Sequence, residues 1–255
     1  MRPDIKAIYF DLDDTLCAYW NASRHGLRTT FEEANLPCGP DKAVEAWRKV
    51  FSYFSPEIKS EKWYEKYLES GGPTRTEHMR RVLRELGCFD EELAQKLSNR
   101  YAELRDQCLE LFPEAEEVLS YLRSHYKLGL ITNGPADVQR QEIETLKLAK
   151  YFDHILIEGE FKLGKPNVEI FDAARSKWGF SPEQMLFVGN AFEHDVQGAK
   201  NAGWWAIWVN KVTEENLGTE PQPDAVITDL WEILDWLGIQ KPSEKAACNP
   251  QHRGC

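Results

Sequence analysis

Short apolar segments alternate with amphipathic helical segments along the second half of the chain, and this order restricts the possible folds more than any other feature. Strand-forming residues fill five of these segments, at Leu128–Thr132, Ile155–Ile157, Met185–Val188, Trp205–Val209 and Ala225–Ile227. Helical patterns occupy Pro113–His125, Pro135–Ala149, Pro166–Trp178, His194–Ala202 and Asp229–Leu237, with Asp229 as a predicted N-cap. Residues 5–10 add an earlier apolar strand. This alternation favours an α/β, doubly wound (Rossmann-like) core with a parallel sheet.

Between residues 17 and 111 the sequence has no strand pattern, and helical patterns follow one another. We predict five helices, at Ala22–Asn35, Asp41–Phe54 with Asp41 as N-cap, Glu57–Leu68, Thr76–Leu86 with Gly87 as C-cap, and Asp90–Leu109. The third is expected to end at residues 71–73, Gly-Gly-Pro. We therefore expect a core domain from residues 1–16 and 112–240, with an all-α domain at 17–111 placed as a lid. Residues 241–255 are polar and aperiodic, which predicts a disordered tail.

The composition narrows the class of protein. The 255-residue chain has a formal net charge of −11, which argues against a nucleic-acid partner. Its six cysteines form no CxxC pair, as expected of reduced thiols. We find neither a signal-peptide pattern nor an apolar run long enough to span a membrane. These features predict a cytoplasmic protein that binds no membrane, and they leave monomer and homodimer open.

Three acids follow the first predicted strand, at Asp11, Asp13 and Asp14. Side chains two residues apart on extended backbone project to the same side, which would bring Asp11 and Asp13 together. Two close carboxylates resist joint ionisation unless a cation neutralises them or one keeps a proton. Either arrangement is useful in catalysis, whereas the alternative is an acidic turn after an edge strand. Asp14 is expected to support the turn.

Polar residues also follow the later strands of the predicted sheet. They are Thr132, Asn133 and Gly134 after one strand, Lys165 in a Gly-Lys-Pro loop, and Asn190 and Asp195 after another. The carboxyl ends of parallel strands lie at one edge of a sheet, where ligands bind in open α/β folds. Carboxylates, an amide, a hydroxyl and a lysine together suit a divalent cation and a phosphate.

Four of these segments resemble the motifs of the haloacid dehalogenase-like (HAD) hydrolase superfamily, in its order and spacing. They are Asp-Leu-Asp-Asp-Thr at 11–15, Ile-Thr-Asn-Gly at 131–134, Gly-Lys-Pro at 164–166 and Gly-Asn-Ala-Phe-Glu-His-Asp-Val at 189–196. Residues 17–111 look like the helical cap of that superfamily. The resemblance covers nearly all of residues 5–240 and implies a Mg²⁺-dependent phosphatase.

The resemblance also implies a role for each motif residue. Asp11 would be the nucleophile that forms an aspartyl-phosphate, and Asp13 would be general acid and then general base. Thr132 and Lys165 would hold the phosphoryl oxygens, with Asn133 as a secondary substrate contact. The implied Mg²⁺ donors are Asp11, the main-chain carbonyl of Asp13, Asn190 and Asp195.

Two positions bear on the alternatives to a phosphatase. Asp13 argues against a 2-haloacid dehalogenase, because halide leaves without a proton and dehalogenating relatives lack this acid. Asn190 departs from the usual acid of metal-dependent members, so we expect weaker metal affinity, and it is the one support for a catalytically weak binding or regulatory protein. A phosphonate-cleaving relative is disfavoured because the helical region offers no obvious Schiff-base lysine.

The sequence does not name the substrate beyond a small phosphorylated metabolite. Trp20, Arg24 and Arg75 are candidates for substrate selection because they lie near the hinge of the helical region or between its helices. Surface charge and packing are the alternative roles for these three residues.

Overall fold

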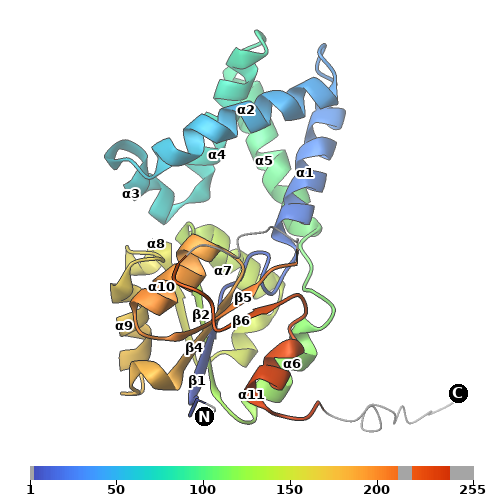
Figure 1. The fold of residues 1–255 in the computed structure, drawn as a ribbon. Helices are drawn as coiled ribbons and strands as arrows, with labels where there is room; N and C mark the ends of the chain where they lie inside the picture. Colours follow the sequence, from blue (N-terminus) through green and yellow to red (C-terminus); the bar gives the residue numbers. More distant parts are fainter. Residues whose placement is uncertain (1–2, 212–219, 242–255) are drawn as a thin grey trace, which may run out of the picture.

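The computed structural model describes residues 3–211 and 220–241 and confirms the α/β prediction (Figure 1). One six-stranded sheet has the order β3-β2-β1-β4-β5-β6, and every neighbouring pair is parallel. The strands are β1 (Ala7–Phe10), β2 (Lys127–Thr132), β3 (His154–Ile157), β4 (Met185–Gly189), β5 (Trp205–Val209) and β6 (Ala225–Ile227). The strand order changes direction at β1, which therefore ends where open α/β sheets bind ligands.

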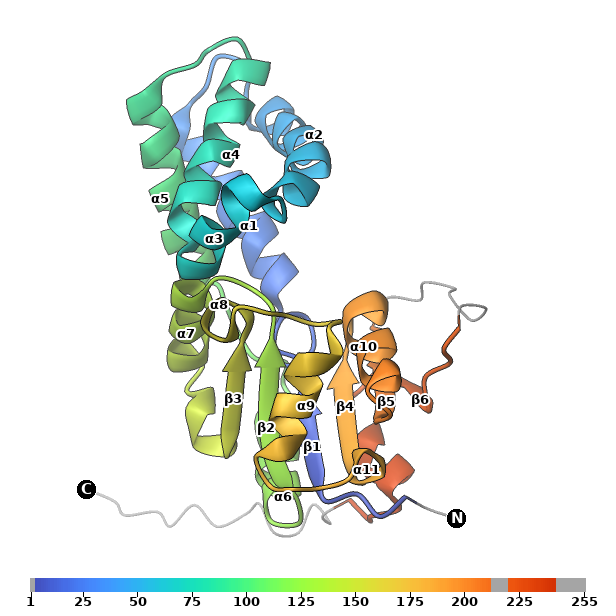
Figure 2. The ribbon, with the colours of Figure 1, turned by 90° about the vertical axis from the view of Figure 1, so that its left-hand side faces the viewer.

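Helices cover both faces of the sheet (Figures 1 and 2). Side chains of β1 alternate, so that Ile8 and Phe10 join the apolar cluster containing α6 (Ala115–Arg123) and α11 (Glu232–Leu237). Ala7 and Tyr9 join the opposite cluster, which contains α9 (Val168–Ser176) and α10 (Gln197–Asn201). Burial on both sides explains why the strands are apolar throughout.

The helices of the described residues fall into an early group and a group that alternates with the strands. The early group is α1 (Tyr19–Ala34), α2 (Pro40–Ile58), α3 (Glu61–Glu69), α4 (Gly71–Glu85) and α5 (Glu91–Gln107). The later α-helices are α6 (Ala115–Arg123), α7 (Ala136–Thr145), α8 (Glu158–Phe161), α9 (Val168–Ser176), α10 (Gln197–Asn201) and α11 (Glu232–Leu237). Leu148–Tyr151 (η1) and Pro182–Gln184 (η2) are 3₁₀ turns, and Phe192–Val196 (η3) is a π-helical turn.

Helices α1 to α5 form a separate layer beyond the carboxyl edge of the sheet (Figure 1). They have their own apolar cluster, which is drawn from residues 27–101 and includes Phe31, Val50 and Phe54. The two segments that join this layer to the sheet run side by side. Ala18 donates its main-chain N–H to Glu110 O at 2.9 Å, and Phe112 donates to Leu16 O at 2.9 Å.

Several predicted ends in the helical layer are wrong. Asp41 is not an N-cap, because α2 begins at Pro40 after Gly39 (φ 79°), and proline suits a first helical turn. Helix α2 continues through Pro56 to Ile58, so residues 57–58 do not begin the third helix. Residues 71–73 are the first turn of α4 rather than a break, because the Ser70 hydroxyl accepts from Gly72 N and a proline there loses no helical hydrogen bond.

Differences also occur around the sheet. The helix predicted at 135–149 ends at Thr145, and Lys147 (φ 53°) separates α7 from η1. Asp229 is not an N-cap: α11 begins at Glu232, and the Asp229 carboxylate accepts from Trp231 N in the preceding turn. Helix α8 was not predicted. The helix predicted at His194–Ala202 is instead η3 followed by α10. Apart from its first residue, the predicted tail at 241–255 lies outside the described residues.

Candidate active site

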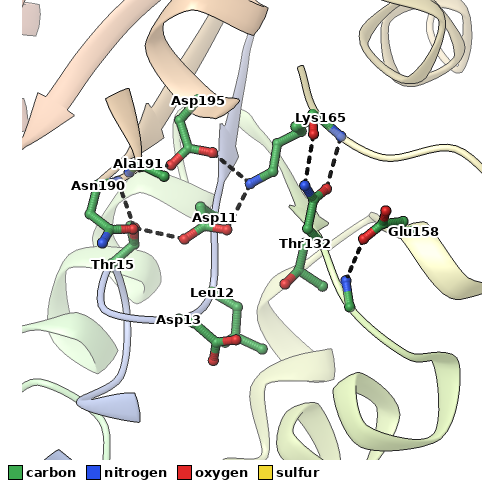
Figure 3. Close-up of polar contacts among 12 residues, drawn as sticks. Asp11, Leu12, Asp13, Thr15, Thr132, Glu158, Lys165, Asn190, Ala191 and Asp195 are labelled. Carbon is green, nitrogen blue, oxygen red and sulfur yellow. Dashed lines mark hydrogen bonds and ion pairs between the residues drawn. The ribbon is translucent and has the colours of Figure 1, made fainter. Parts of the chain in front are cut away.

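A buried lysine between two acids lies at the carboxyl edge of the sheet (Figure 3). Lys165 Nζ is 2.7 Å from Asp11 Oδ1 and 2.7 Å from Asp195 Oδ1, the latter as an ion pair without hydrogen-bond geometry. All three residues are buried. Burial opposes the charged form of Lys165, yet the adjacent carboxylates of Asp11 and Asp195 raise its pKa above the ordinary value. The structure therefore brings together three residues that the sequence placed on separate strand ends.

Asn133 fixes the main chain of Lys165. Its side-chain amide donates to Lys165 O at 2.8 Å and accepts from Lys165 N at 2.8 Å. The next residue, Gly134, donates its N–H to the carboxylate of Glu158 at 2.9 Å. Asn133 thus positions the lysine in this structure, and substrate contact by Asn133 stays a prediction.

Thr15 connects the end of β1 to the end of β4. Its hydroxyl oxygen lies 3.0 Å from Asp11 Oδ2 and 3.2 Å from Asn190 Oδ1, and it accepts from Asn190 N at 3.0 Å. Asp195 Oδ2 accepts from Ala191 N at 2.8 Å. A Cβ on Gly189 would lie 2.3 Å from Asp195 Oδ2, so only glycine fits beside this carboxylate. The oxygens of Asp11 and Asn190 therefore converge on one point.

Asp13 faces a different set of partners from Asp11. Gln139 Nε2 donates to Asp13 Oδ2 at 3.2 Å and to Glu142 Oε2 at 2.8 Å. Burial, followed by the nearby charge of Asp11, raises the pKa of Asp13 to about 7. Burial and Asp13 likewise raise the pKa of Glu142 well above its ordinary value. Burial and mutual repulsion in this environment therefore favour a proton on one of these carboxylates.

Thr132 ends β2, but its hydroxyl does not line either of the cavities at this edge. It donates to Gln139 Oε1 at 2.5 Å and is 1% exposed. Its contact with a phosphoryl group stays a prediction. Asp14 supports the turn as expected, because its carboxylate accepts from Trp20 N in the first turn of α1.

Three polar residues were missed by the sequence reasoning. Gln139 and Glu142 lie on the buried face of α7, beside Ile143, and two polar residues on an apolar face are the signal that could have found them. Glu158 begins the short helix α8 and is 1% exposed. It binds Lys59 and Tyr64 of the helical layer at 2.5 and 2.8 Å, as well as Gly134 N, so it connects that layer to the second motif.

Two adjoining cavities open at this edge. The first, of about 240 Å³, is lined by Asp11, Asn133, Lys165 and Asn190 among others. The second, of about 330 Å³, lies between the helical layer and the sheet. Both are lined by Asp13, Tyr19, Trp20 and Asn133, so a ligand can extend from one into the other. Trp20 and Arg75 line the second cavity, whereas Arg24 lines a separate cavity in the helical layer.

The described residues contain no group of three or more His, Cys, Asp or Glu side chains arranged to hold a metal ion. Amide and main-chain oxygens are a different kind of donor. The Asp11 carboxylate and the Asn190 amide oxygen meet at Thr15, and the main-chain carbonyl of Asp13 follows two residues after Asp11. Because Mg²⁺ takes oxygen ligands, retains waters and needs one or two carboxylates, this donor set fits it.

A family model for haloacid dehalogenase-like hydrolases matches residues 5–203. The chain belongs to the haloacid dehalogenase-like hydrolases. The match includes all four motifs and the whole helical layer, and it confirms the family resemblance found in the sequence.

Curated members of this family are similar over most of their length. N-acylneuraminate-9-phosphatase of Mus musculus is 30% identical over 244 residues, which cover 90% of this chain and 92% of that protein. Phosphoserine phosphatase of Thermus thermophilus is 31% identical over 248 residues, covering 90% and 98%. Both relatives are named for the removal of phosphate from small molecules.

Solved structures share the fold. The HAD-hydrolase YfnB of Bacillus subtilis, bound to magnesium, has a TM-score of 0.73 at 22% identity and covers 94% of this chain and 100% of its own. A 2-haloacid dehalogenase from Pseudomonas syringae has a TM-score of 0.65 at 27% identity and covers 92% and 98%.

Proposed function

We propose that this protein is a Mg²⁺-dependent phosphomonoester hydrolase that acts on a small phosphorylated metabolite. The observation that carries the proposal is the position of Asp11, beside the buried Lys165 ammonium at the wall of a cavity. A carboxylate held 2.7 Å from a lysine suits attack on an anionic phosphorus centre, because the lysine offsets the repulsion between the two anions. The phosphatase names of the relatives support the same reaction.

The reaction would proceed in two displacements. Asp11 attacks phosphorus, an aspartyl-phosphate forms, and the bond from phosphorus to the leaving oxygen breaks. Asp13 gives its proton to that oxygen, so that a neutral alcohol departs. Asp13 then takes a proton from water as the water attacks phosphorus, and the bond to Asp11 breaks to release phosphate. A pKa of about 7 for Asp13 suits both proton transfers at neutral pH.

Asp11, Asn190 and the Asp13 main-chain carbonyl would hold the magnesium ion, and Asp195 would act through water because Lys165 and Ala191 N engage its carboxylate. When bound, Mg²⁺ supplies positive charge that shields the nucleophile and the phosphoryl oxygens from each other. Asn190 brings an oxygen but no charge, so the affinity for the metal should be weak. Thr132 would contact the phosphoryl group after its hydroxyl leaves Gln139.

The surroundings of Asp13 raise the pKa of its carboxyl and so favour the protonated form. This favours phosphatase over dehalogenase chemistry, because a halide ion leaves without a proton. The intact Asp11–Lys165–Asp195 cluster weighs against a binding or regulatory protein without activity.

We further propose that residues 17–111 act as a cap on a core formed by residues 1–16 and 112–240. The separate apolar cluster of the helical layer and its paired connecting segments support this division. Within the described residues, no helix is both long and apolar enough to cross a membrane. The cytoplasmic location stays a prediction, and monomer and homodimer both stay open. Analytical ultracentrifugation would distinguish the monomer from the homodimer.

Hydrolysis of para-nitrophenyl phosphate with and without Mg²⁺ tests the proposal. The wild type should release nitrophenol only with the metal, and Asp11→Asn should abolish the release. Chloride release from 2-chloropropionate, measured in parallel, should be absent. Metal-independent turnover, turnover by Asp11→Asn, or dehalogenation in place of phosphate release would each contradict the proposal.

A further inference from the structure

The cavity between the helical layer and the sheet has an uneven distribution of charge. Among the residues that the structure describes, three cationic side chains line it, Lys59, Arg75 and Arg105, whereas Asp13 is the one acidic residue in its lining. His78 also lines it, and burial lowers the pKa of its imidazole to about 4, so it is neutral at neutral pH. The balance of charge in the second cavity therefore favours an anion.

Two of the three cations already have acidic partners. Lys59 Nζ lies 2.5 Å from Glu158 Oε1, and Arg105 Nη2 lies 2.5 Å from Asp106 Oδ1. Neither cation is free to neutralise a ligand without giving up a contact within the protein. Arg75 is different, because no carboxylate lies within ion-pair distance of it among the residues that the structure describes.

Arg75 is held in place through one edge of its guanidinium group. Its Nε donates to Ser98 O at 3.1 Å, which anchors the side chain of α4 to helix α5. In the described part of the chain, neither Nη atom has a hydrogen-bond partner. Nη1 lies beside Gly71, whose hydrogen faces Pro135 and Val138 just after the second motif. The unpaired edge is thus fixed at the boundary between the helical layer and the sheet.

Burial, with the nearby charge of Arg105, lowers the pKa of Arg75, and this effect outweighs the opposite influence of Asp106 and Asp137, which lie beyond ion-pair distance. A guanidinium group stays protonated even so, and a ligand with a negative charge would relieve both effects. An arginine without an ion-pair partner at a partly enclosed site therefore suits an anionic ligand group.

We propose that Arg75 binds a carboxylate of the substrate, so that the enzyme acts on phosphomonoesters that also carry a carboxylate. This inference rests on the proposed phosphatase function. The phosphoryl group would lie in the first cavity beside Asp11 and Lys165, and the carboxylate in the second. The planar edge of a guanidinium group matches a carboxylate through two parallel hydrogen bonds. A second phosphate would bring up to two negative charges. It suits the site less well than a carboxylate, because the other cations of the cavity are already paired.

The rest of the cavity suits the carbon skeleton of such a substrate. Trp20, Trp47 and Phe51 form an aromatic wall, with Trp47 and Phe51 stacked at 5.1 Å between ring centroids. Aromatic faces pack against carbon atoms without demanding specific hydrogen bonds. Phosphate, carboxylate and an apolar contact would then orient the substrate at three places.

Matched substrate pairs test the proposal directly. One pair is 3-phosphoglycerate and glycerol 3-phosphate, and the other is phosphoserine and phosphoethanolamine; in each pair only the first member has a carboxylate. The wild type should have a kcat/KM at least about tenfold higher for the carboxylated member of one pair or both, as expected for a hydrogen bond between charged groups. Arg75→Met should reduce this preference to about one.

Controls separate loss of recognition from loss of folding or of catalysis. Arg75→Met should lose more in kcat/KM on the carboxylated member of each pair than on para-nitrophenyl phosphate, because that probe has no carboxylate. Arg84→Met, at an exposed position on the same helix, should retain the preference. If Arg75→Met does not fold, Arg75→Gln replaces it, and the comparison of pairs in the wild type remains decisive.

Three results would overturn the inference. These are equal or absent turnover of both members of both pairs by an enzyme that hydrolyses para-nitrophenyl phosphate, a preference that survives in the Arg75 variants, and a stronger preference for a bisphosphate that depends on Arg75. Absence of para-nitrophenyl phosphate hydrolysis in the wild type would instead overturn the proposed phosphatase function.

Discussion

Gln139→Leu should weaken proton transfer by Asp13 without removing any group that touches phosphorus. The change deletes the bond from Nε2 to Asp13 Oδ2, together with the contacts of Gln139 to Thr132 and Glu142. A hydrogen bond to a charged group contributes about 1.5–3 kcal/mol, which corresponds to about 10- to 150-fold in rate if it is fully lost in the transition state. The 3.2 Å distance places this bond at the lower end, so we expect about a tenfold loss in kcat.

The leaving group distinguishes this role from general damage. Nitrophenolate is a weak base that departs without a proton, whereas the alkoxide of 3-phosphoglycerate needs one. Gln139→Leu should therefore lose about tenfold in kcat on the alkyl phosphate and little on para-nitrophenyl phosphate. Gln141→Leu, at an exposed position on the same helix, is the matched control and should lose neither. An equal loss on both substrates, or no loss on the alkyl phosphate, would refute the positioning role.

Three further predictions concern stability, the contact between layers, and the metal. Burial lowers the pKa of His78 from 6.5 to about 4, so the unfolded state binds a proton before the folded state does as the pH falls. Up to about 3 kcal/mol of the folding stability present above pH 6.5 is therefore lost by pH 4. His78→Phe should lose less than the wild type in thermal unfolding between these pH values, and equal losses would argue against this titration. Gly159→Ala would place a Cβ 2.2 Å from a main-chain atom of α3 and 2.3 Å from a main-chain atom at the start of α7. It should therefore destabilise the protein by about 1–3 kcal/mol and raise KM. Gly72→Ala, whose Cβ would make ordinary contacts, should do neither. Asn190→Asp adds a negative charge to the proposed donor set and should lower the Mg²⁺ activation constant; an unchanged constant would place the metal elsewhere.

The strand ends could be predicted because a parallel sheet brings them to one edge. Asp11, Lys165 and Asp195 are far apart in the sequence, yet each follows an apolar strand or its loop, and the structure joins them through contacts of 2.7 Å. The alternation of strands and helices sufficed for this result. No knowledge of side-chain packing was needed.

The partners of Asp13 and Thr132 could not be predicted in the same way. Both contact Gln139, whose position depends on how α7 packs on the sheet rather than on any local pattern. Glu158 likewise connects the helical layer to the core only because Lys59 of that layer lies beside its carboxylate. The start of α4 was missed for a related reason, since its first turn also depends on the Asp137 carboxylate of the core, which accepts from Gly71 N at 3.0 Å.

The most direct test of the account is the capture of the covalent intermediate. The wild type would be mixed with Mg²⁺ and a ³²P-labelled phosphomonoester, quenched in acid within the first turnover, and digested for mass spectrometry. We predict one phosphoryl group on the peptide that contains Asp11, which is removed by hydroxylamine as expected of an acyl-phosphate and is absent in Asp11→Asn. Release of phosphate with no label on Asp11, or with the label on another residue, would contradict the central claim.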